Sequence, residues 1–577
     1  MSLDPTPTQT GSAASDQPRP ALPERVDLIV LGSGAAGLGA ALTAALGGLD
    51  CLVLEHRGTL GGTSARSSGT VWVPGNPQSG GDADLAEAVR YLDALVGDKA
   101  PREMRGAFLD SAREMLADLS THAGLALRPL TASQDYRPEL PGAAPGSRAL
   151  EPLPFDGRQL GKDFATLAEP LRELMLFGQV MVTRAEAAQL LRADRSARGA
   201  GLALALMGRT AADRLRGYRR GTRLVMGNAL VARLYRACRD RGVRVRTGAH
   251  VTALTSDAGR VTGVTLADGQ RVTAAQGVVL AGGGFPASAR MRAEQMPEPV
   301  PGFTPAAPGC DGSTLKLGLE AGGRLGPPGA DNALWFPSSI FTRADGSHVP
   351  YPHIVLDRAK PGAIIVGQDG RRFANEALPY HYFVRAMYAA NTNGQTIPAW
   401  MICDRGFIAR YGFGAIRPRT PHLGRYIASG YLITAPDAGA LARRLDLPAE
   451  ALATTLAQVN ADAETGTDSA FSRGESAYDR ALGDPDHAPN PCFGRIGPGP
   501  LYALRIEPTP LGTSRGLVTD THARVLDAAG IPIPGLYACG NDMHSPFGGE
   551  YPGAGAQLGL ALTFGWRAAR HAAGIGT

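Results

Sequence analysis

The chain has 577 residues, and its net charge of +5 is small for that length. Domains usually contain about 100–200 residues, so we expect two or three of them. No run of Lys or Arg forms a basic stripe, which argues against nucleic acid as a partner. No uninterrupted apolar run reaches the roughly 18 residues that suggest a transmembrane helix.

Two further features bear on localisation. Residues 1–24 are rich in Pro, Ser, Thr and Ala but lack the basic start and apolar stretch of a secretion signal, so we expect a disordered tail. The six cysteines show no CxxC spacing, which predicts buried, reduced thiols and no metal site. Both features favour a cytoplasmic protein.

A dinucleotide-binding motif opens the predicted globular part of the chain. Residues 26–31 form an apolar run typical of a buried strand, and it continues directly into Gly32-Ser33-Gly34-Ala35-Ala36-Gly37. An Ala-rich helical stretch (38–46), a second apolar strand (50–54) and then Glu55 follow in order. This order predicts a βαβ unit of about 30 residues with G-x-G-x-x-G at its first turn.

Each glycine of the motif has an expected role. Gly32 permits the tight turn, Gly34 lets the backbone approach a pyrophosphate, and Gly37 lets the helix pack close to the strand. The pyrophosphate would face the helix N-terminus, where free N–H groups favour negative charge. Glu55 stands where a carboxylate accepts hydrogen bonds from ribose hydroxyls.

The loop after Glu55 distinguishes FAD from NAD. An NAD dehydrogenase usually continues with another strand here, whereas residues 56–69 are rich in Gly, Ser and Thr. Small hydroxyls and bare backbone suit the ribityl and pyrophosphate groups of an extended cofactor. We therefore expect FAD, bound in part by this loop through His56, Gly61, Gly62, Thr63, Ser64, Ser68 and Gly69.

Two later segments complete a pattern that resembles the FAD-binding family of fumarate reductase and succinate dehydrogenase flavoproteins. Residues 277–285 read as an apolar strand ending in glycines, preceded by a run of short strands whose last is Arg271–Thr273. Residues 535–542 resemble the late strand whose polar end meets the ribityl chain. The resemblance implies further FAD contacts at Val251, Ala281, Gly282, Gly283, Gly540, Asn541, Gly555, Gln557 and Leu558.

The same resemblance implies how the cofactor is attached and how the chain is organised. Ser64 stands near the position where covalently flavinylated relatives carry a histidine, and residues 61–69 contain no His, so we expect noncovalent FAD. The implied fold is α/β, a Rossmann-like FAD-binding domain with an inserted α+β substrate (capping) domain. We expect the FAD-binding domain at 25–285 and 491–577 and the substrate domain at 286–490.

The dicarboxylate clamp of fumarate reductases is not recognisable in this chain. Arg372-Phe373-Ala374-Asn375-Glu376 looks like the family's R-F-x-N-E motif, but Tyr380 stands in the neighbourhood of the relay arginine. Residues 510–516 contain no His, although fumarate reductases place one there. We expect Glu376 to be a structural acceptor.

Four pieces instead resemble 3-ketosteroid Δ1-dehydrogenases: residues 62–64 with 72–77, 135–139 with 148–152, 511–513 with 516–520, and Tyr551-Pro552-Gly553-Ala554-Gly555. Those enzymes hold the substrate ketone with a tyrosine and with a backbone N–H four residues later. A second tyrosine removes the proton beside the ketone, helped by a third. By position, the resemblance implies Tyr551 and Gly555 for the ketone, Tyr380 for the proton, and Tyr136 as the helper.

The leading prediction is therefore an FAD-dependent dehydrogenase that acts next to the ketone of a steroid-like small molecule and passes electrons to an acceptor that no motif identifies. A fumarate-reductase-like enzyme that reduces another unsaturated substrate, and a non-catalytic flavin-binding protein, stay open as alternatives. Arg66 and residues 545–550 depart from the ketosteroid pattern, so the steroid ring itself stays open. His544 is expected near the flavin, as a substrate ligand, an acid or a satisfied loop residue.

Overall fold

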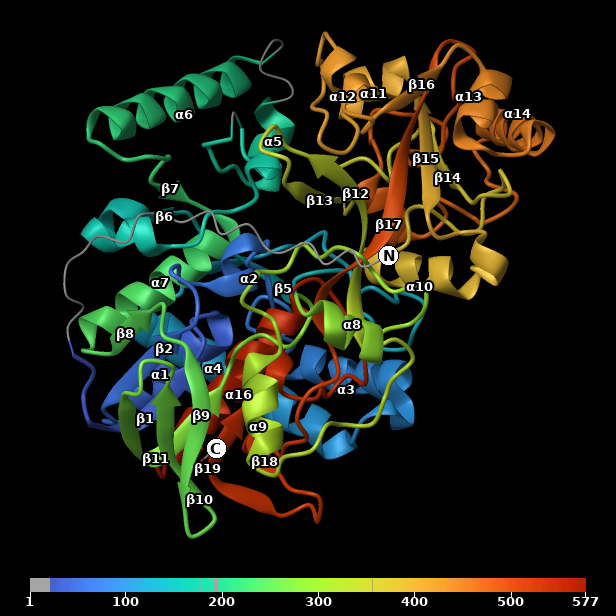
Figure 1. Cartoon of the computed structure of the whole chain (residues 1–577). Helices are drawn as coiled ribbons and strands as arrows, with labels where there is room; N and C mark the ends of the chain where they lie inside the picture. Colours follow the sequence, from blue (N-terminus) through green and yellow to red (C-terminus); the bar gives the residue numbers. More distant parts are fainter. Residues whose placement is uncertain (1–20, 177, 191–195, 355, 577) are drawn as a thin grey trace.

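The computed structural model describes residues 21–176, 178–190, 196–354 and 356–576, and its architecture rests on two separate sheets (Figure 1). The predicted tail lies outside the described residues up to residue 20. Closer to the first strand, the Glu24 carbonyl accepts a hydrogen bond from the N–H of Thr273 at 2.9 Å. Glu24, the last residue of the predicted tail, is therefore hydrogen-bonded to β11 of the sheet.

The first sheet has eight strands in a mixed arrangement with a parallel centre. Its path is β18-β19-β11-β1-β2-β8, and β10 and β9 extend it from β11 as antiparallel strands. The bounds are β1 Arg25–Leu31, β2 Cys51–Glu55, β8 Arg244–Thr247, β9 Val251–Asp257, β10 Arg260–Leu266, β11 Arg271–Leu280, β18 Arg524–Leu526 and β19 Pro532–Ala538. Segments more than 200 residues apart in sequence thus pair at the centre, as the predicted Rossmann-like fold requires.

Strand β1 is buried on both faces, which explains its apolar sequence. Leu28 and Val30 pack into one apolar cluster, and Ile29 and Leu31 pack into another. Helix α1 (Ala35–Leu46) follows the first turn and packs against α7 (Met226–Asp240) and α16 (Ala556–Ala572). Strand β11 is one ten-residue strand, whereas the sequence pattern breaks it at residues 274–276.

The second sheet is antiparallel and has six strands, ordered β13-β12-β17-β15-β14 with β16 beside β17. Its bounds are β12 Ala333–Thr342, β13 His348–Pro352, β14 Ala363–Val366, β15 Ala399–Asp404, β16 Ile433–Ala435 and β17 Leu501–Thr513. The central strand β17 lies after residue 490, so this sheet includes residues beyond the predicted end of the substrate domain. Helices α10 Tyr380–Ala389, α11 Arg405–Tyr411, α12 Gly424–Ala428, α13 Ala438–Leu445, α14 Ala449–Thr465 and α15 Ala477–Leu482 belong to this part.

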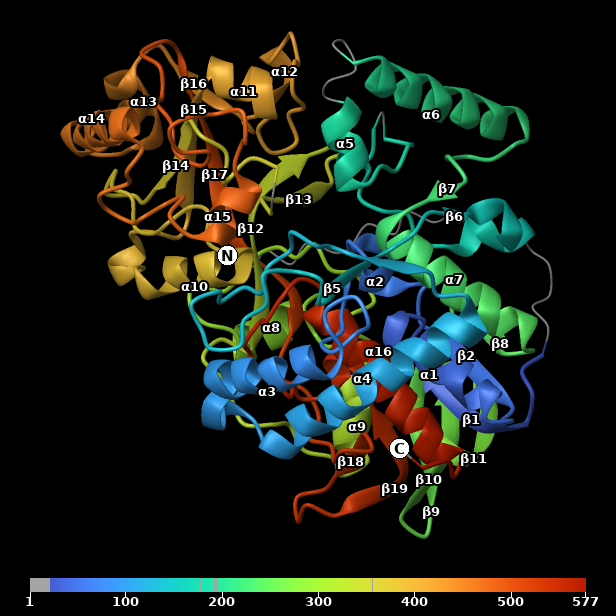
Figure 2. The ribbon, with the colours of Figure 1, turned by 180° about the vertical axis from the view of Figure 1, so that it is seen from behind.

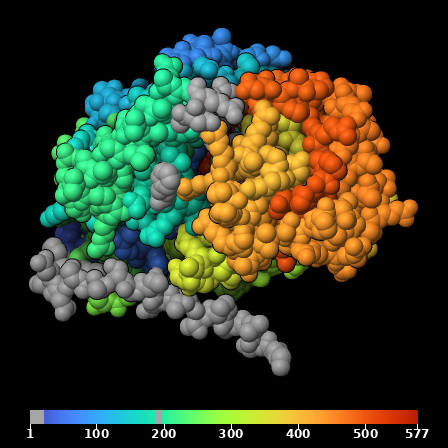
Figure 3. Space-filling view, turned by 90° about the horizontal axis from the view of Figure 1, so that it is seen from above, coloured from blue at the N-terminus to red at the C-terminus, as the bar shows by residue number. Residues whose placement is uncertain are grey.

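The remaining elements connect and flank the two sheets (Figure 2). A three-stranded sheet contains β3 Val71–Trp72, β4 Leu127–Pro129 and β5 Ala149–Pro152, and a two-stranded one contains β6 Phe155–Asp156 and β7 Arg223–Leu224. The other helices are α2 Gly62–Arg66, α3 Asp82–Val96, α4 Arg102–Ala123, α5 Arg184–Leu190, α6 Ala197–Leu215, α8 Ala289–Gln295 and α9 Ser313–Glu320, with short 3-10 turns at 97–99, 157–166, 172–174, 392–394 and 540–542. Seen from above, the teal segment around α6 and the orange segment of the second sheet form neighbouring parts of one face (Figure 3).

Three general features bear on the class of protein. All six cysteines are free and buried, as their scattered spacing predicts. Across the described ranges, no helix combines the length and apolarity needed to cross a bilayer. In the same ranges, no group of three or more His, Cys, Asp and Glu side chains is arranged to hold a metal ion.

Candidate active site

The glycines of the first turn are required by close backbone contacts. Gly32 has φ 109°, and a β-carbon there would lie 2.3 Å from the carbonyl oxygen of Ala281. A β-carbon at Gly37 would lie 2.0 Å from the carbonyl oxygen of Gly32. At Gly34 the nearest atom would be the Ser64 hydroxyl at 3.4 Å, an ordinary contact. Packing within the chain therefore does not explain Gly34, whereas a ligand approaching the start of α1 does.

Glu55 stabilises this turn from the end of β2. Its carboxylate accepts hydrogen bonds from the N–H and hydroxyl of Ser33, at 3.0 and 2.5 Å, and from the N–H of Arg57 at 2.8 Å. A carboxylate has about four acceptor positions, so a ribose hydroxyl can add to these three. The ribose contact stays a prediction, and the structure adds a local role that the sequence pattern did not suggest.

The glycine- and serine-rich loop folds back onto the same turn. The N–H of Gly61 donates to the Ser33 hydroxyl, and the N–H of Ala35 donates to the Ser64 hydroxyl, both at 3.0 Å. The Thr63 hydroxyl accepts from the N–H of Ala307 at 2.9 Å. Two other predicted loop residues make contacts within the protein: Ser68 donates to the Thr70 hydroxyl at 3.0 Å, and Gly69, with φ 68°, lies against the Met226 backbone.

Asp542 joins the two later cofactor segments, and sequence reasoning missed it. Its buried carboxylate accepts from the N–H of Gly282 at 2.6 Å and from the N–H of Gly284 at 2.8 Å. Burial raises the pKa of this carboxyl although both N–H groups act against that. The adjacent Gly540, with φ 63°, approaches the helix after the first turn, where its β-carbon would lie 3.1 Å from Cβ of Ala36. The sequence signal that could have identified Asp542 is its position, because it is an acid that directly follows Gly540-Asn541 at the end of a strand.

Four other predicted cofactor residues, His56, Val251, Gln557 and Leu558, lie at the ends of this arrangement. His56 approaches His250, with their Nδ1 atoms 2.9 Å apart, beside the start of β9 at Val251. Gln557 and Leu558 lie in the first turn of α16. The Gln557 side-chain nitrogen is buried and has no hydrogen-bond acceptor within the described part of the chain. An orphaned buried amide needs a partner, so this donor fits a ligand that the protein itself does not supply.

Tyr136, Tyr380 and Tyr551 meet in one buried cluster. The Tyr136 hydroxyl donates to the Tyr380 hydroxyl at 2.9 Å. The three rings contact one another pairwise, with centroids 5.4 to 5.6 Å apart. Tyr380 is the first residue of α10, Tyr136 lies between β4 and β5, and Tyr551 lies in the loop before α16. Three remote segments thus converge as the resemblance implies, and the ring of Tyr478 packs against Tyr136 as a fourth member.

Backbone contacts fix the loop that carries Tyr551. The Pro552 carbonyl accepts from the N–H of Tyr136 at 2.9 Å and from the hydroxyl of Tyr91 at 2.7 Å. Gly555 has φ 90°, its carbonyl accepts from the N–H of Trp72 at 3.1 Å, and a β-carbon there would lie 2.5 Å from the Thr70 carbonyl oxygen. Within the described residues, no acceptor takes the N–H of Gly555. This position therefore requires glycine and offers a backbone donor at the start of α16.

A charged group anchors the same loop to α10, and sequence reasoning missed it. The Glu550 carboxylate forms ion pairs with Lys99 at 2.9 Å and with Arg385 at 3.0 Å, and it accepts from the Tyr382 hydroxyl at 3.0 Å. The N–H of Tyr551 in turn donates to the Tyr382 hydroxyl at 3.3 Å. Glu550 directly precedes Tyr551 in sequence, but its partners come from elsewhere, which is why the sequence gives no sign of them.

Burial controls the ionisation of the cluster. It raises the pKa of Tyr380 well above the usual value, and the neighbouring hydroxyls of Tyr136 and Tyr551 add to this effect. Burial raises the pKa of Tyr551 to about 12, while its hydrogen bond with Tyr380 acts in the opposite direction. Burial also holds the pKa of His381, which lies against Tyr551, well below its usual value. At neutral pH all three side chains are therefore uncharged.

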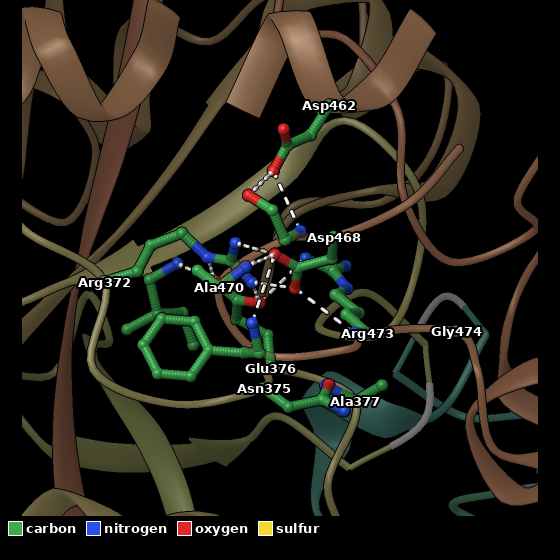
Figure 4. A network of polar contacts seen from close by, with 12 residues as sticks. Arg372, Asn375, Glu376, Ala377, Asp462, Asp468, Ala470, Arg473 and Gly474 are labelled. Atoms are coloured by element: carbon green, nitrogen blue, oxygen red, sulfur yellow. Dashed lines mark hydrogen bonds and ion pairs between the residues drawn. The ribbon is translucent and has the colours of Figure 1, made fainter. Parts of the chain in front are cut away.

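His544 and Glu376, which the sequence also placed near the site, lie in surroundings of their own. His544 packs against the backbone of Gly326, and burial lowers its pKa to about 4, so it is neutral at pH 7. Glu376 is fully buried and pairs with Arg372 at 2.7 Å and Arg473 at 3.1 Å (Figure 4). Burial alone would raise the pKa of Glu376, but the two arginines hold it below its usual value. These contacts give Glu376 the environment of a structural acceptor.

A cavity of about 520 Å³ adjoins the tyrosine cluster. Its lining includes Tyr136, Tyr382 and Tyr478, together with Leu378 and Pro379 just before Tyr380. Small-molecule sites commonly enclose about 300–1,000 Å³ and combine apolar walls with a few polar groups. The volume of this cavity is in that range.

The cofactor segments and the tyrosine cluster together define a flavoprotein. Residues 27–558 match the family described as "FAD binding domain", and the chain belongs to that family. Its resemblance to the fumarate reductase and succinate dehydrogenase flavoproteins and the predicted α/β fold are thereby confirmed.

Particular relatives extend over nearly the whole chain. The chain is 36% identical over 569 residues to 3-oxosteroid 1-dehydrogenase of Mycobacterium tuberculosis, covering 95% of this chain and 98% of the relative. It is 36% identical over 556 residues to 4-oxocyclohex-2-ene-1-carboxylate 5-dehydrogenase of Sinomonas cyclohexanicum, covering 95% and 93%. The crystal structure of 3-ketosteroid Δ1-dehydrogenase from Sterolibacterium denitrificans, in complex with 1,4-androstadiene-3,17-dione, has a TM-score of 0.89 and 35% identity, covering 96% of this chain and all of that one.

Proposed function

We propose that the protein is an FAD-dependent dehydrogenase that introduces a C=C bond next to the ketone of a cyclic substrate. Relatives of this chain that carry out such reactions on 3-oxosteroids and on oxocyclohexene carboxylates match it over 95% of its length. The observation that carries the proposal is the buried cluster of Tyr136, Tyr380 and Tyr551, with the first two hydroxyls 2.9 Å apart. The cluster adjoins the loop that leads into the cofactor-binding helix α16.

In this proposal Tyr551 and Gly555 hold the ketone. The hydroxyl of a neutral tyrosine is a donor, and burial keeps Tyr551 neutral by raising its pKa to about 12. The Gly555 N–H is a second donor without an acceptor among the described residues. Two donors aimed at the carbonyl oxygen would stabilise the enolate-like charge that develops when the adjacent carbon loses its proton.

Tyr380 removes that proton in its phenolate form. Burial opposes the phenolate, since it raises the pKa of Tyr380. The Tyr136 hydroxyl, 2.9 Å from the Tyr380 oxygen, is the helper in this proposal, although in the resting protein it adds to the rise in the pKa of Tyr380. When bound, FAD supplies the hydride acceptor for the neighbouring carbon. One proton and one hydride then leave adjacent carbons, and the C=C bond forms between them.

We further propose that FAD binds noncovalently, through the turn at Gly32–Gly37, the loop at 61–69, the backbone at 281–283 and the first turn of α16. The absence of any atom closer than 3.4 Å to a β-carbon at Gly34 and the orphaned amide of Gln557 support this assignment. The two named relatives act on substrates of different size, a steroid and a single-ring keto acid. The proposal therefore specifies a cyclic ketone, with a 3-ketosteroid as the leading candidate.

The test is anaerobic mixing of the holoenzyme with a panel of ketones while the flavin band at about 450 nm is followed. The panel includes 3-ketosteroids and 4-oxocyclohexane carboxylates. We expect at least one of them to bleach the flavin. If no ketone does so and the reduced enzyme rapidly reduces fumarate, the fumarate-reductase-like alternative replaces this proposal.

A further inference from the structure

Arg358 is a fully buried arginine to which the proposed reaction gives no role. It lies between β13 and β14, and only 1% of its surface is exposed. Among the residues that the structure describes, no carboxylate forms an ion pair with its guanidinium. The neighbouring Asp357 carboxylate instead lies 2.7 Å from Nδ1 of His353 and accepts from the N–H of Gly414 at 3.0 Å. A buried charge without an ionic partner is costly, so its presence here needs an explanation.

All three side-chain nitrogens of Arg358 donate to backbone carbonyls. Nε bonds to the carbonyl of His353 at 3.1 Å, Nη2 bonds to that of Leu378 at 2.6 Å, and Nη1 bonds to that of Glu376. The planar fork of a guanidinium holds two acceptors in a fixed geometry, which the point charge of an ammonium group does not do. Arg358 therefore clamps residues 376–378 from inside the protein.

The clamped segment leads directly into the proton-removing tyrosine of the proposed reaction. Only Pro379 separates Leu378 from Tyr380, the first residue of α10. Proline has a fixed φ, which is −51° here, so the Leu378 carbonyl and the Cα atom of Tyr380 move nearly as one unit. Further along α10, the centroid of the Phe383 ring lies 4.8 Å from the guanidinium carbon. Arg358 thus contacts the chain on both sides of Tyr380.

The position of the Tyr380 hydroxyl depends on how firmly the start of α10 is held. This hydroxyl lies 2.9 Å from that of Tyr136, whose own N–H donates to the Pro552 carbonyl at 2.9 Å. No side chain caps the start of α10, since Pro379 supplies no hydrogen bond there. A displacement of about 1 Å at a reacting group can cost roughly 10²-fold in rate. The clamp by Arg358 supplies the rigidity that a capping side chain does not.

We propose that Arg358 is a positioning residue for the removal of the proton, acting through Tyr380 and not on the substrate. Its fork holds the carbonyls of Glu376 and Leu378, and this keeps the Tyr380 hydroxyl beside Tyr136 and within reach of the carbon next to the ketone. Burial lowers the pKa of Arg358 to about 10, so the guanidinium stays charged at neutral pH. The inference rests on the proposed function, because Arg358 has this role only if Tyr380 is the base.

The charge of Arg358 offers a competing explanation, since a nearby cation stabilises a phenolate. Lysine separates the two explanations, because it keeps a positive charge but does not reproduce the planar fork that holds two carbonyls. If the clamp matters, Arg358→Lys and Arg358→Met should both slow the reaction. If the charge alone matters, only Arg358→Met should do so.

The test follows anaerobic flavin reduction in the holoenzymes by the ketone that bleaches wild type fastest. We expect both variants to lower the maximal rate of reduction by about tenfold to 10²-fold, while the ketone dissociation constant stays within about twofold of the wild-type value. Substrates labelled with deuterium add a measurement that a general loss of stability would not change. The isotope effect at the carbon that loses the proton should increase in both variants, and the one at the carbon that loses the hydride should not.

Arg292→Met is the matched control. Arg292 in α8 is 7% exposed and also donates to three carbonyls, those of Pro286, Pro301 and Gly302. None of these residues belongs to a tyrosine-bearing segment. The control should lose stability in urea as Arg358→Met does, but keep the wild-type rate of flavin reduction and both isotope effects.

The proposal is overturned if Arg358→Lys reduces its flavin at the wild-type rate, or if the rate falls without a change in the isotope effect at the proton-losing carbon. It is also overturned if Arg292→Met shows the same pattern, because any loss of buried contacts then suffices. If Arg358→Met does not retain flavin, Arg358→Lys alone decides the result. Failure of the proposed function differs from all of these, since no ketone would then bleach even the wild type, and Arg358 would lose this role with it.

Discussion

Tyr551 and Tyr380 touch within one buried cluster, but in the proposed reaction they act on different steps. Tyr551→Phe keeps the ring and removes the ketone donor, so it should weaken ketone binding and slow flavin reduction together. Tyr380→Phe should leave binding nearly unchanged and slow flavin reduction by roughly 10²–10⁴-fold. Ligand titration and stopped-flow reduction measure the two effects. Tyr478→Phe is a useful control, since that ring packs in the cluster without an assigned role in the chemistry. Near wild-type reduction in Tyr380→Phe would place the base elsewhere.

The raised pKa of Tyr380 has a consequence for pH dependence. The phenolate is the base form, so its fraction increases with pH everywhere below that pKa. Since the pKa lies well above its usual value, the rate of flavin reduction should rise steadily between about pH 6 and pH 9 without reaching a plateau. Single-turnover rates across this range provide the measurement. A plateau near neutral pH in wild type would show that a group with a much lower pKa removes the proton.

At the scale of an element, the first turn and α1 should control cofactor binding. Gly34→Val places a side chain where we expect the pyrophosphate, so the purified variant should lack most of its FAD. Gly58→Val is the matched control, because a β-carbon at Gly58 meets no atom within 4 Å. Equilibrium titration of apoprotein with FAD gives the two dissociation constants.

Acid precipitation of wild type should release all of the flavin, and flavin left on the polypeptide would contradict noncovalent binding.

The buried ion-pair network around β14 should stabilise the second sheet. Glu376 and Asp468 together balance the charges of Arg372 and Arg473, so Glu376→Gln leaves one buried positive charge without its partner and should lower the free energy of unfolding by about 3–5 kcal/mol. The pair Glu464–Arg495 is 63% exposed on both sides, and Glu464→Gln should change the stability by no more than about 1 kcal/mol. Urea unfolding compares the two variants. Equal and small effects would show that the network contributes little to stability.

Local patterns in the sequence predict the elements whose residues are contiguous. The first βαβ unit and the final helix were predictable because strand, turn and helix signals act within about 30 residues. The tyrosine-bearing loop before that helix was implied only by the family resemblance. Strand β11 was not recognised as continuous, because its polar first half pairs with β10 while its apolar second half lies between β1 and β19. The contacts of Asp542 and Glu550 join segments up to 451 residues apart, so no local pattern predicts them.

At the scale of the whole molecule, the proposed site depends on segments that meet from different parts of the chain. Tyr136 and Tyr551 come from segments that pack around the FAD-binding part, whereas Tyr380 begins a helix against the second sheet. The hydrogen bond from the N–H of Tyr136 to the Pro552 carbonyl connects two of these segments. The ion pair between Glu550 and Arg385 connects the loop before α16 to α10. The arrangement of the two parts, and not any single motif, therefore sets the geometry of the tyrosines.

The central claim is that the substrate must carry a ketone held by Tyr551 and Gly555, because the proton beside it becomes acidic only through that carbonyl. The most direct measurement is anaerobic flavin reduction by a cyclic ketone that bleaches the enzyme and by the corresponding alcohol, which differs only in having the carbonyl reduced. The account predicts rapid bleaching by the ketone and none by the alcohol under the same conditions. Bleaching by the alcohol at a similar rate would contradict it.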